Sequence, residues 1–419
     1  MRLPRDPRID STAALLAAPY DLVRKTCDRL GSNQFETRLL LRKTVCMRGP
    51  SAAAFFYDES RFVRRGAMPE PVRATLLGKG GVQGLDGEEH RRRKALFMSL
   101  LAPERVDELA RIAEEEWLTD VPRWTAKERL SLYDAMHPIL MRAVCRWAGV
   151  PLSDQAVASR TCDIVALFDK AAALGLGHVR ARLARRRLER WLEKLVEDAR
   201  NGRSTVLGAG ALHVIALHRD ERDQLLPPRV AAVELLNLLR PTVAVSVYIV
   251  LLAHAIHSFP ETVPLRSEPD RHEQFVQEVR RFYPFFPAVM ARVRRRFEWQ
   301  EVSFPPGRRV LLDLHGTNLS PEWGDPEAFR PERFAGWSDD PFLLVPQGGG
   351  EPHRHHRCPG EGVALTLMKT ALRMLTTGIA YDVPDQDLRI RRSRMPALPA
   401  DRFQIESVHL IQAASREVQ

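Results

Sequence analysis

Val345-Pro-Gln-Gly-Gly-Gly-Glu-Pro-His-Arg-His-His-Arg-Cys-Pro-Gly-Glu-Gly362 is the stretch that decides how the rest of the chain is interpreted. Its three consecutive glycines predict a loop, because glycine weakens both helices and strands. A long helical run, Val363 to Ile379, follows, so Cys358 stands at the start of a helix and among several arginines and histidines. A helix N-terminus and nearby cations both lower the pKa of a thiol. We therefore expect Cys358 to be a nucleophile or a metal ligand.

The residues of this loop alone leave three interpretations open. The first is a free cysteine in a basic loop. The second is a zinc site of Cys358 with His353, His355 or His356, although these ligands crowd into one segment and no second ligand pair occurs elsewhere. The third is a single axial thiolate to haem iron, which needs a rigid loop and basic side chains for the haem propionates.

Length and composition indicate an ordinary globular protein with a large core. The chain has 419 residues, of which 44% are hydrophobic and 28% charged. We find no repeat or linker and expect one domain over residues 1–419. The five cysteines have no paired spacing, which favours a reducing compartment. We expect no apolar run of transmembrane length and no signal segment, and hence a soluble, cytoplasmic protein.

The charge of the chain is strongly positive, with a formal net charge of +10. Arginine triplets occur at residues 91–93, 185–187 and 294–296, but they lie far apart and no aromatic-interleaved basic patch accompanies them. This pattern disfavours nucleic-acid binding. Solvated helix faces, anion binding or attraction of an acidic substrate or protein are favoured instead.

Hydrophobic periodicity predicts a mainly helical chain with a small β part. Strand signals are nearly absent before residue 297, apart from Thr37 to Cys46. Phe297 to Leu314 predicts two strands around a Pro-Pro-Gly turn, and short strands around Arg389 to Val408 finish the chain. Residues 69–90 predict a long glycine-bearing loop of the kind that lines sites. The helices are predicted at residues 11–30, 52–57, 87–101, 103–117, 130–147, 153–174, 179–201, 227–258 and 273–282.

The pair Arg240-Pro241 interrupts the longest apolar helical stretch, Pro227 to Ser258. A proline inside a helix costs about 3 kcal/mol, and a buried arginine is expensive without a partner. Two interpretations stay open on these residues. Either two helices meet here with Arg240 at the surface, or a kinked helix points Arg240 into an apolar cavity, where it binds an anion.

These stretches, in this order, resemble a cytochrome P450. That family carries a glutamate and an arginine on one helix, as in Glu278 and Arg281, and later a Pro-Glu-Arg-Phe motif, as in residues 331–334. Its cysteine loop has a basic residue two before the cysteine and a glycine two after, as in His356 and Gly360. The resemblance spans nearly the whole chain. It implies a single-domain cytochrome P450 fold, haem b as cofactor and Cys358 as the axial iron ligand.

Two departures narrow the resemblance to one branch. Glu351 replaces the usual phenylalanine seven residues before the cysteine, and Arg240-Pro241 replaces the usual acid–alcohol pair of the central helix. In both features this chain resembles the bacterial fatty-acid peroxygenases. These enzymes use hydrogen peroxide to hydroxylate or decarboxylate fatty acids. Val82-Gln-Gly-Leu-Asp-Gly87 and Phe282-Tyr-Pro-Phe-Phe-Pro287 also resemble that branch.

The resemblance assigns a role to each candidate site residue. Arg240, beside the kink at Pro241, would hold the substrate carboxylate, and that carboxylate would act as general acid–base in peroxide cleavage. Gln83 would lie on the distal side, and Glu278, Arg281 and Arg333 would support the core. The implied products are 2- or 3-hydroxy fatty acids, with decarboxylation to terminal alkenes as a competing outcome. The propionate candidates are His90, Lys94 and His356; the candidates for the acyl tunnel are Leu76, Leu77 and Phe168.

Two rival functions remain at this point. One is a cytochrome P450 monooxygenase fed electrons by an acidic, ferredoxin-like partner, which the basic surface would suit but Arg240-Pro241 argues against. The other is a non-catalytic haem-binding or sensor protein. The peroxygenase interpretation implies a fatty acid and hydrogen peroxide as partners, with no redox partner, no nucleic acid and no membrane insertion.

Overall fold

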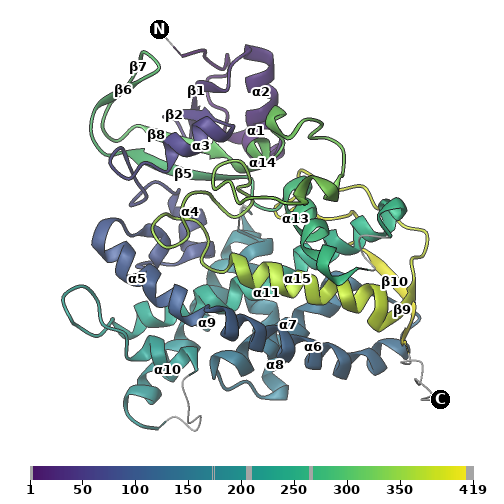
Figure 1. Cartoon of the computed structure of the whole chain (residues 1–419). Helices are drawn as coiled ribbons and strands as arrows, with labels where there is room; N and C mark the ends of the chain where they lie inside the picture. Colours follow the sequence, from purple (N-terminus) through teal and green to yellow (C-terminus); the bar gives the residue numbers. More distant parts are fainter. Residues whose placement is uncertain (1–2, 172, 174, 204–209, 264–267, 412–419) are drawn as a thin grey trace.

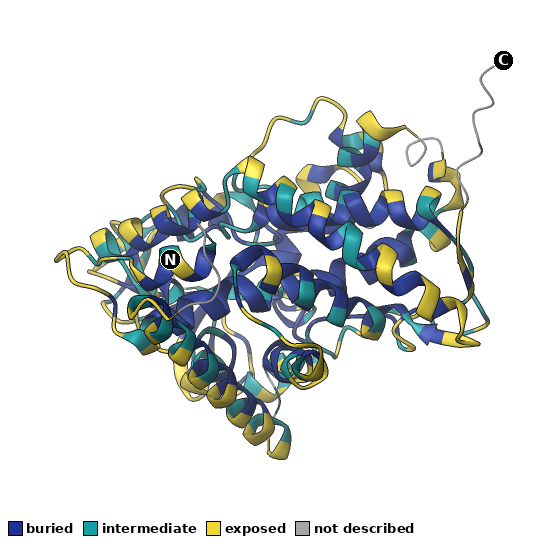
Figure 2. Ribbon diagram, turned by 90° about the horizontal axis from the view of Figure 1, so that it is seen from below, coloured by how far each residue is buried: buried dark blue, intermediate teal, exposed yellow. Residues whose placement is uncertain are grey.

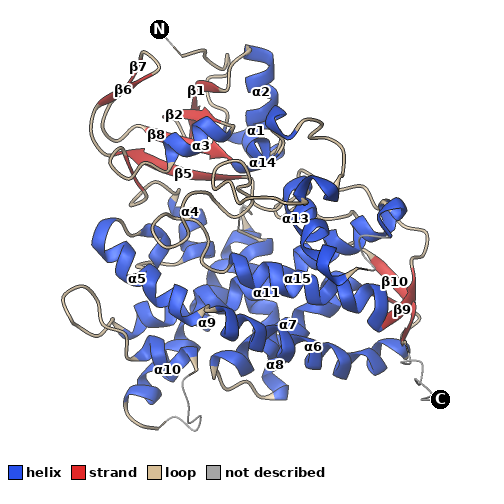
Figure 3. Ribbon diagram, in the orientation of Figure 1, coloured by secondary structure: helices blue, strands red, loops and turns tan. Residues whose placement is uncertain are grey.

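The computed structural model of the chain describes residues 3–171, 173, 175–203, 210–263 and 268–411. Helices make up one end of the molecule, and a β-rich part that contains the N-terminal segment makes up the other (Figures 1 and 3). The cysteine loop runs between these two parts. This arrangement confirms the predicted mainly helical fold with a small β part.

Long helices form the body of the molecule. Glycine or proline marks many of their ends, as at Gly149 after α7 and Pro103 at the start of α6. The helices are α1 (Thr12–Ala17), α2 (Leu22–Leu30), α3 (Pro50–Phe56), α4 (Glu70–Val72), α5 (Gly87–Leu100), α6 (Pro103–Thr125), α7 (Leu132–Ala148), α8 (Asp154–Asp169), α9 (Leu176–Arg200), α10 (Ala211–Ala216), α11 (Pro228–Ser258), α13 (His272–Phe282), α14 (Leu314–Asn318) and α15 (Glu361–Arg373). The 3₁₀ segments are η2 (Val82–Gly84), η3 (Pro260–Thr262), η4 (Pro269–Arg271), η5 (Pro321–Trp323) and η6 (Pro331–Phe334), and the π-helical segments are η1 (Arg73–Leu77) and η7 (Met374–Gly378).

Helix α11 is the core of the helical part. It packs against α7, α9 and α15, and most of its residues are buried; Figure 2 shows the buried residues in dark blue and the exposed ones in yellow. By length and composition α11 would suffice to cross a membrane, so the prediction that no apolar run reaches that length is wrong. However, 94% of its most apolar window is buried inside the protein, as expected for a core helix.

The β part is larger than predicted. Its main sheet has the strand order β1-β2-β8-β5-β3, in which β2 and β8 are parallel and the other neighbours antiparallel. The prediction that strands are nearly absent before residue 297 is therefore wrong. The strands are β1 (Gln34–Leu39), β2 (Arg42–Met47), β3 (Phe62–Val63), β4 (Arg129–Ser131), β5 (Ala288–Val293), β6 (Phe297–Trp299), β7 (Val302–Phe304), β8 (Arg309–Asp313), β9 (Ile379–Asp382) and β10 (Gln404–Leu410).

Several predicted boundaries need correction. The single strand predicted from Thr37 to Cys46 is a hairpin that turns at Leu40 and Leu41. The predicted helix at residues 11–30 is two helices, and residues 69–90 contain α4, η1 and η2 rather than an unstructured loop. The strands predicted around Pro-Pro-Gly form a β6–β7 hairpin plus β8, which joins the main sheet. The helix predicted to end at Leu174 ends at Asp169, and Leu174 lies outside the described residues.

Candidate active site

The cysteine loop is held by close backbone contacts that glycine makes possible. A Cβ on Gly349 would lie 2.7 Å from the Pro341 carbonyl oxygen, and Gly348 has a positive φ of 94°. The Cys358 N–H donates to the Gln347 carbonyl at 3.1 Å. Helix α15 begins at Glu361, directly after Gly360, so the half-buried thiol lies at a helix N-terminus as predicted.

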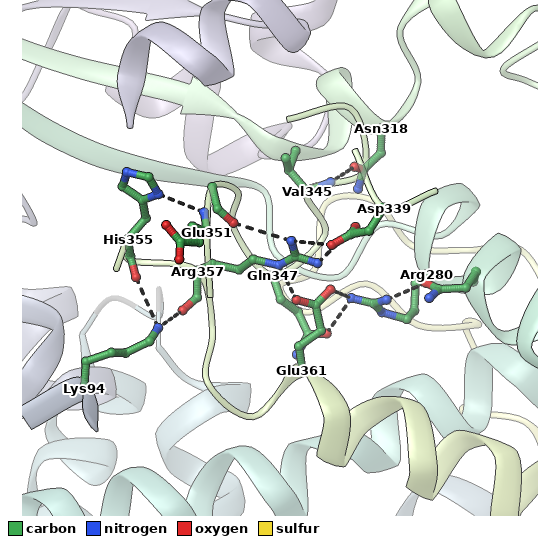
Figure 4. Close-up of polar contacts among 12 residues, drawn as sticks. Lys94, Arg280, Asn318, Asp339, Val345, Gln347, Glu351, His355, Arg357 and Glu361 are labelled. Atoms are coloured by element: carbon green, nitrogen blue, oxygen red, sulfur yellow. Dashed lines mark hydrogen bonds and ion pairs between the residues drawn. The ribbon is translucent and has the colours of Figure 1, made fainter. Parts of the chain in front are cut away.

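The charges around Cys358 differ from the prediction. Arg357 donates to Glu361 at 2.6 Å and to Asp339 at 2.9 Å, and Glu361 also accepts from Arg280 (Figure 4). These acids neutralise the arginines that the sequence placed beside the thiol. Burial is the largest influence and raises the pKa of Cys358, while the Gly360 N–H and Lys94 oppose it. The expected fall in the thiol pKa is therefore wrong; a coordinated metal ion, when bound, deprotonates a thiol outright.

Helix α11 presents Arg240 in the interior. The helix runs unbroken through Pro241, and Arg240 is only 6% exposed, which rules out the surface interpretation. Its Nη1 is buried and has no hydrogen-bond partner among the described residues. Burial and the nearby Arg185 lower the pKa of Arg240 to about 9, while the charge of Cys358 acts in the opposite direction. An arginine charged at neutral pH and left unpaired in the interior indicates an anion site.

A buried polar network connects α11 to Gln83. The Asn237 amide donates to the Gln83 side-chain oxygen at 3.2 Å and to Glu234 at 2.9 Å. Arg93 of α5 donates to the other oxygen of Glu234 at 2.5 Å. Gln83 was predicted from the sequence as a site residue, whereas Arg93, Glu234 and Asn237 were not. Polar residues at positions 234, 237 and 240 share one face of an otherwise apolar helix, and this spacing was the available signal.

The residues predicted for the acyl tunnel come together in the interior. Leu76 and Phe168 are buried in one apolar cluster, and Leu77 packs against it. Arg185 of α9 donates to the carbonyl groups of Thr75 and Leu76, both at 3.0 Å. These bonds fix η1 against α9. Leu76, Leu77 and Phe168 thus belong to the large apolar core of the helical part, and their place along an acyl tunnel stays a prediction.

The propionate candidates form a compact basic group with one addition. His90 stacks on His356 with ring centroids 3.8 Å apart, and Lys94 donates to the carbonyl groups of His355, at 3.2 Å, and Arg357 (Figure 4). The addition is Arg64, which was not predicted from the sequence and whose charge acts on both His90 and His356. The buried Arg64 Nη1 and His90 Nδ1 have no hydrogen-bond partner among the described residues.

The electrostatics of this basic group agree with an anionic ligand. Burial lowers the pKa of His90 to about 4 and that of His356 well below its usual value, and neighbouring cations contribute in both cases. Burial also lowers the pKa of Arg64. Two orphaned nitrogens within a crowd of basic groups therefore fit the carboxylates of a haem beside Cys358. No cluster of three or more potential metal-binding side chains occurs in the described part of the chain, so the zinc alternative lacks a ligand set.

The Glu278–Arg281 pair lies away from this chemistry. Arg281 binds Glu278 through two hydrogen bonds of 2.6 and 2.7 Å, and Arg333 approaches the same carboxylate at 3.3 Å. The Glu278 and Arg281 side chains are fully buried. The group fastens α13 to η6 and the chain around it, which agrees with the structural role implied by the resemblance.

The comparisons with known proteins agree on one family. The family model described as cytochrome P450 matches residues 272–392. Among curated proteins, a putative cytochrome P450 138 of Mycobacterium tuberculosis is 24% identical over 89% of this chain and 88% of its own length. Cytochrome P450 3A15 of Cavia porcellus is 30% identical over 32% of this chain, and the match spans only 27% of that protein.

The solved structures give longer and closer matches. Cytochrome P450SP alpha in complex with (R)-ibuprophen is 51% identical, with a TM-score of 0.93, over 96% of this chain and 99% of that chain. Cytochrome P450EX alpha with myristic acid is 40% identical, with a TM-score of 0.94, over 98% of this chain and 100% of that chain. A variant of cytochrome P450 OleT in complex with arachidonic acid is 31% identical, with a TM-score of 0.95, over 99% and 100% of the two chains.

Proposed function

The chain belongs to the cytochrome P450 family, within the branch of bacterial fatty-acid peroxygenases, and we propose that Arg240 makes it selective for carboxylic acids that it oxidises at Cα or Cβ with hydrogen peroxide. The observation that carries this proposal is the buried guanidinium of Arg240, whose Nη1 has no partner among the described residues. The myristic acid, arachidonic acid and (R)-ibuprophen of the similar structures are all carboxylic acids, which supports it.

The substrate carboxylate completes the site at Arg240. A guanidinium offers two parallel N–H donors that match a carboxylate, and such charge-assisted bonds are strong in an interior. Leu238, Leu239 and Val243 of α11 beside Arg240 in sequence are apolar and buried, so an acid with a hydrocarbon chain satisfies both the charge and these apolar neighbours. The chain of the acid would extend toward Leu76, Leu77 and Phe168.

Proton transfer to and from peroxide then falls to the substrate carboxylate. The acid and the alcohol of α11 closest to Arg240 in sequence are already engaged: Glu234 pairs with Arg93 and accepts from Asn237, and the Thr242 hydroxyl donates to the Leu238 carbonyl at 2.9 Å. A carboxylate held by Arg240 is free of such bonds on its remaining lone pairs and can act as general acid–base. Gln83, fixed by Asn237, would provide a polar contact beside it.

Haem b, when bound, supplies the oxidising chemistry, with its iron held by the Cys358 thiolate. We propose that Arg64, His90 and His356 hold the propionates, because two of these side chains carry orphaned nitrogens. Lys94 braces the loop through its carbonyl groups and adds positive charge. Anchoring the carboxylate at Arg240 leaves Cα and Cβ as the carbons nearest the reacting centre. Hydroxylation there gives 2- or 3-hydroxy acids, and loss of the carboxyl group gives a terminal alkene.

Product analysis tests the proposal. Purified, haem-loaded protein is mixed with straight-chain fatty acids and hydrogen peroxide, without reductase or NAD(P)H, and the products are identified by mass spectrometry. We expect hydroxy acids or terminal alkenes, and no product from the matching fatty alcohols. If no acid gives a product while the haem stays intact, the proposal fails, and the same acids with a ferredoxin and its reductase then test the partner-fed monooxygenase.

A further inference from the structure

The tip of the β1–β2 hairpin combines two unfavourable features. Leu40 and Leu41 form its turn with φ values of 52° and 60°, a conformation for which asparagine and glycine are strongly preferred. Their exposed fractions are 51% and 76%, and the nearby Ile9 is 81% exposed. Strained, exposed leucines in place of Asn-Gly indicate a use for the side chains themselves.

The two backbone N–H groups of this turn are hydrogen-bonded to side chains. The Leu40 N–H donates to the Thr12 hydroxyl and the Leu41 N–H donates to the Asp10 carboxylate, both at 2.6 Å. An unsatisfied N–H would cost several kcal/mol in a hydrocarbon environment. With these donors satisfied, the two backbone N–H groups of the turn do not need water as a partner.

Three arginines lie on one face of the main sheet next to the tip. Arg292 of β5 pairs directly with Arg309 of β8, and Arg309 pairs with Thr44 of β2. Arg42 stands two residues before Thr44 and directly after the tip, so its side chain emerges on the same face. The three arginines are therefore neighbours on adjacent strands.

This arginine triad, Arg42, Arg292 and Arg309, lacks an anion within the described part of the chain. No side-chain hydrogen bond or ion pair to any of the three is found there, and the Nη1 of Arg309, a residue only 9% exposed, is buried without a partner. Burial and the charges of Arg42 and Arg292 lower the pKa of Arg309. Three like charges on adjacent strands repel, and an anion bound between them would relieve this repulsion.

We propose that this hairpin face docks on a membrane surface that contains anionic phospholipid. Leu40 and Leu41 enter the boundary between headgroups and acyl chains, and a lipid phosphate lies on the arginine triad. An apolar tip directly beside unpaired cations is the combination that such surfaces bind, whereas a free phosphate would need only the cations. The inference goes beyond the proposed function and does not depend on it.

Vesicle co-sedimentation of the haem-loaded protein tests this proposal. The vesicles contain either equal parts of phosphatidylglycerol and phosphatidylcholine or phosphatidylcholine alone. We expect binding to the anionic vesicles only. In R42Q/R292Q, which leaves the buried Arg309 in place, we expect the vesicle affinity to fall by roughly thirtyfold. In L40N/L41G we expect binding to be lost with an unchanged or raised Tm, because Asn-Gly suits this turn.

Matched variants separate this face from general effects of charge and apolar exposure. R190Q/R222Q removes the same charge from exposed arginines elsewhere, and L176N removes a leucine that is 77% exposed. We expect less than a twofold change for both. Equal losses in these controls, or equal binding to both kinds of vesicle, would overturn the proposal. A third result would also overturn it: inorganic phosphate raises the Tm only when Arg42 and Arg292 are present, and the protein binds no vesicles. That result would assign the arginine triad to a soluble phosphate.

Discussion

Arg281 and Arg240 are both buried arginines on helices, and the structure treats them in opposite ways. Arg281 is fully buried and makes two hydrogen bonds to Glu278, one to the Pro326 carbonyl at 2.9 Å and one to the Ala328 carbonyl at 3.0 Å. Arg240 is 6% exposed, and its Nη1 has no partner among the described residues. The chain itself satisfies the first arginine and leaves the second for a ligand.

The difference separates a residue that holds the fold from one that holds a substrate. Removing one member of a buried pair leaves an uncompensated charge, so the pair resists mutation. Removing a buried charge that has no partner takes away a cost. Changes at the two arginine sites should therefore affect different properties: folding at one, turnover at the other.

The largest effect is expected for Glu278→Gln, which leaves Arg281 with an uncompensated charge in the core. We expect the free energy of unfolding to fall by about 3–5 kcal/mol, as found for broken buried pairs. Guanidinium denaturation of the haem-loaded protein measures it, with the exposed Glu332→Gln as control. A loss below about 1 kcal/mol, within reach of an ordinary surface change, would remove the contrast with Arg240.

Arg240→Met should show the reverse pattern. The substitution removes an unpaired charge, so we expect a free energy of unfolding equal to or higher than that of the native chain. Peroxide-driven turnover of fatty acids should fall by about a hundredfold or more, because the general acid–base is no longer held in place. Product formation and denaturation are measured on the same preparation, with the exposed Arg190→Met as control. A variant that unfolds easily but turns over normally would contradict the assignment.

A smaller effect is expected for Asn237→Leu, which separates Gln83 from Glu234. One hydrogen bond contributes on the order of 1 kcal/mol, so kcat/KM should fall roughly fivefold. The ratio of Cα to Cβ products should also change. Leucine also removes the bond that the Asn237 amide donates to the buried Glu234, so the free energy of unfolding should fall by about 1–3 kcal/mol. If Asn237 acts on kcat/KM only through Gln83, then Asn237→Leu should cause no further fall in kcat/KM in a protein that already carries Gln83→Leu.

The smallest effect is expected from pH. The pKa of Arg240 is lowered to about 9 by burial, so the guanidinium is charged below that pH and loses its charge above it. Fatty-acid affinity should therefore be constant from about pH 7 to 8, fall to about half near pH 9 and continue to fall above. Equilibrium titration of the haem-loaded protein with a fatty acid measures this profile. A flat profile to pH 10 in the native chain, matching that of Arg240→Met, would argue against a contact with the carboxylate.

Local sequence patterns predicted most of the helices but little of the sheet. The helices follow from hydrophobic periodicity, whereas β2, β5 and β8 are neighbours only because distant segments fold together. The two unpredicted hairpins turn at Leu40-Leu41 and at Gln300-Glu301, where non-glycine residues adopt a positive φ. Neither turn contains the asparagine or glycine that signals a hairpin in a sequence.

The site residues that the sequence predicted are those whose residue type is unusual for the surrounding segment. Arg240 and Cys358 stood out because an apolar helix and a glycine-rich loop rarely contain such groups. Arg64 and Arg93 were missed because exposed positions could have accommodated them equally well, whereas Asn237 was missed although it lies three residues before Arg240 on the apolar helix. The predicted direction of the Cys358 pKa was wrong because burial of the thiol, which only the folded chain determines, is the largest influence and raises the pKa, and the charge of Glu361 adds to it.

The engaged polar groups of α11 also define what an inhibitor of this protein would look like. A fatty amide or alkane of the right length would fill the apolar region next to η1 but would bring no carboxylate to Arg240. Such a molecule would occupy the enzyme and carry no group able to take up or return a proton. Removing the carboxylate from a fatty acid would thus convert a substrate into a competitive inhibitor. Hydrogen peroxide would then not be consumed.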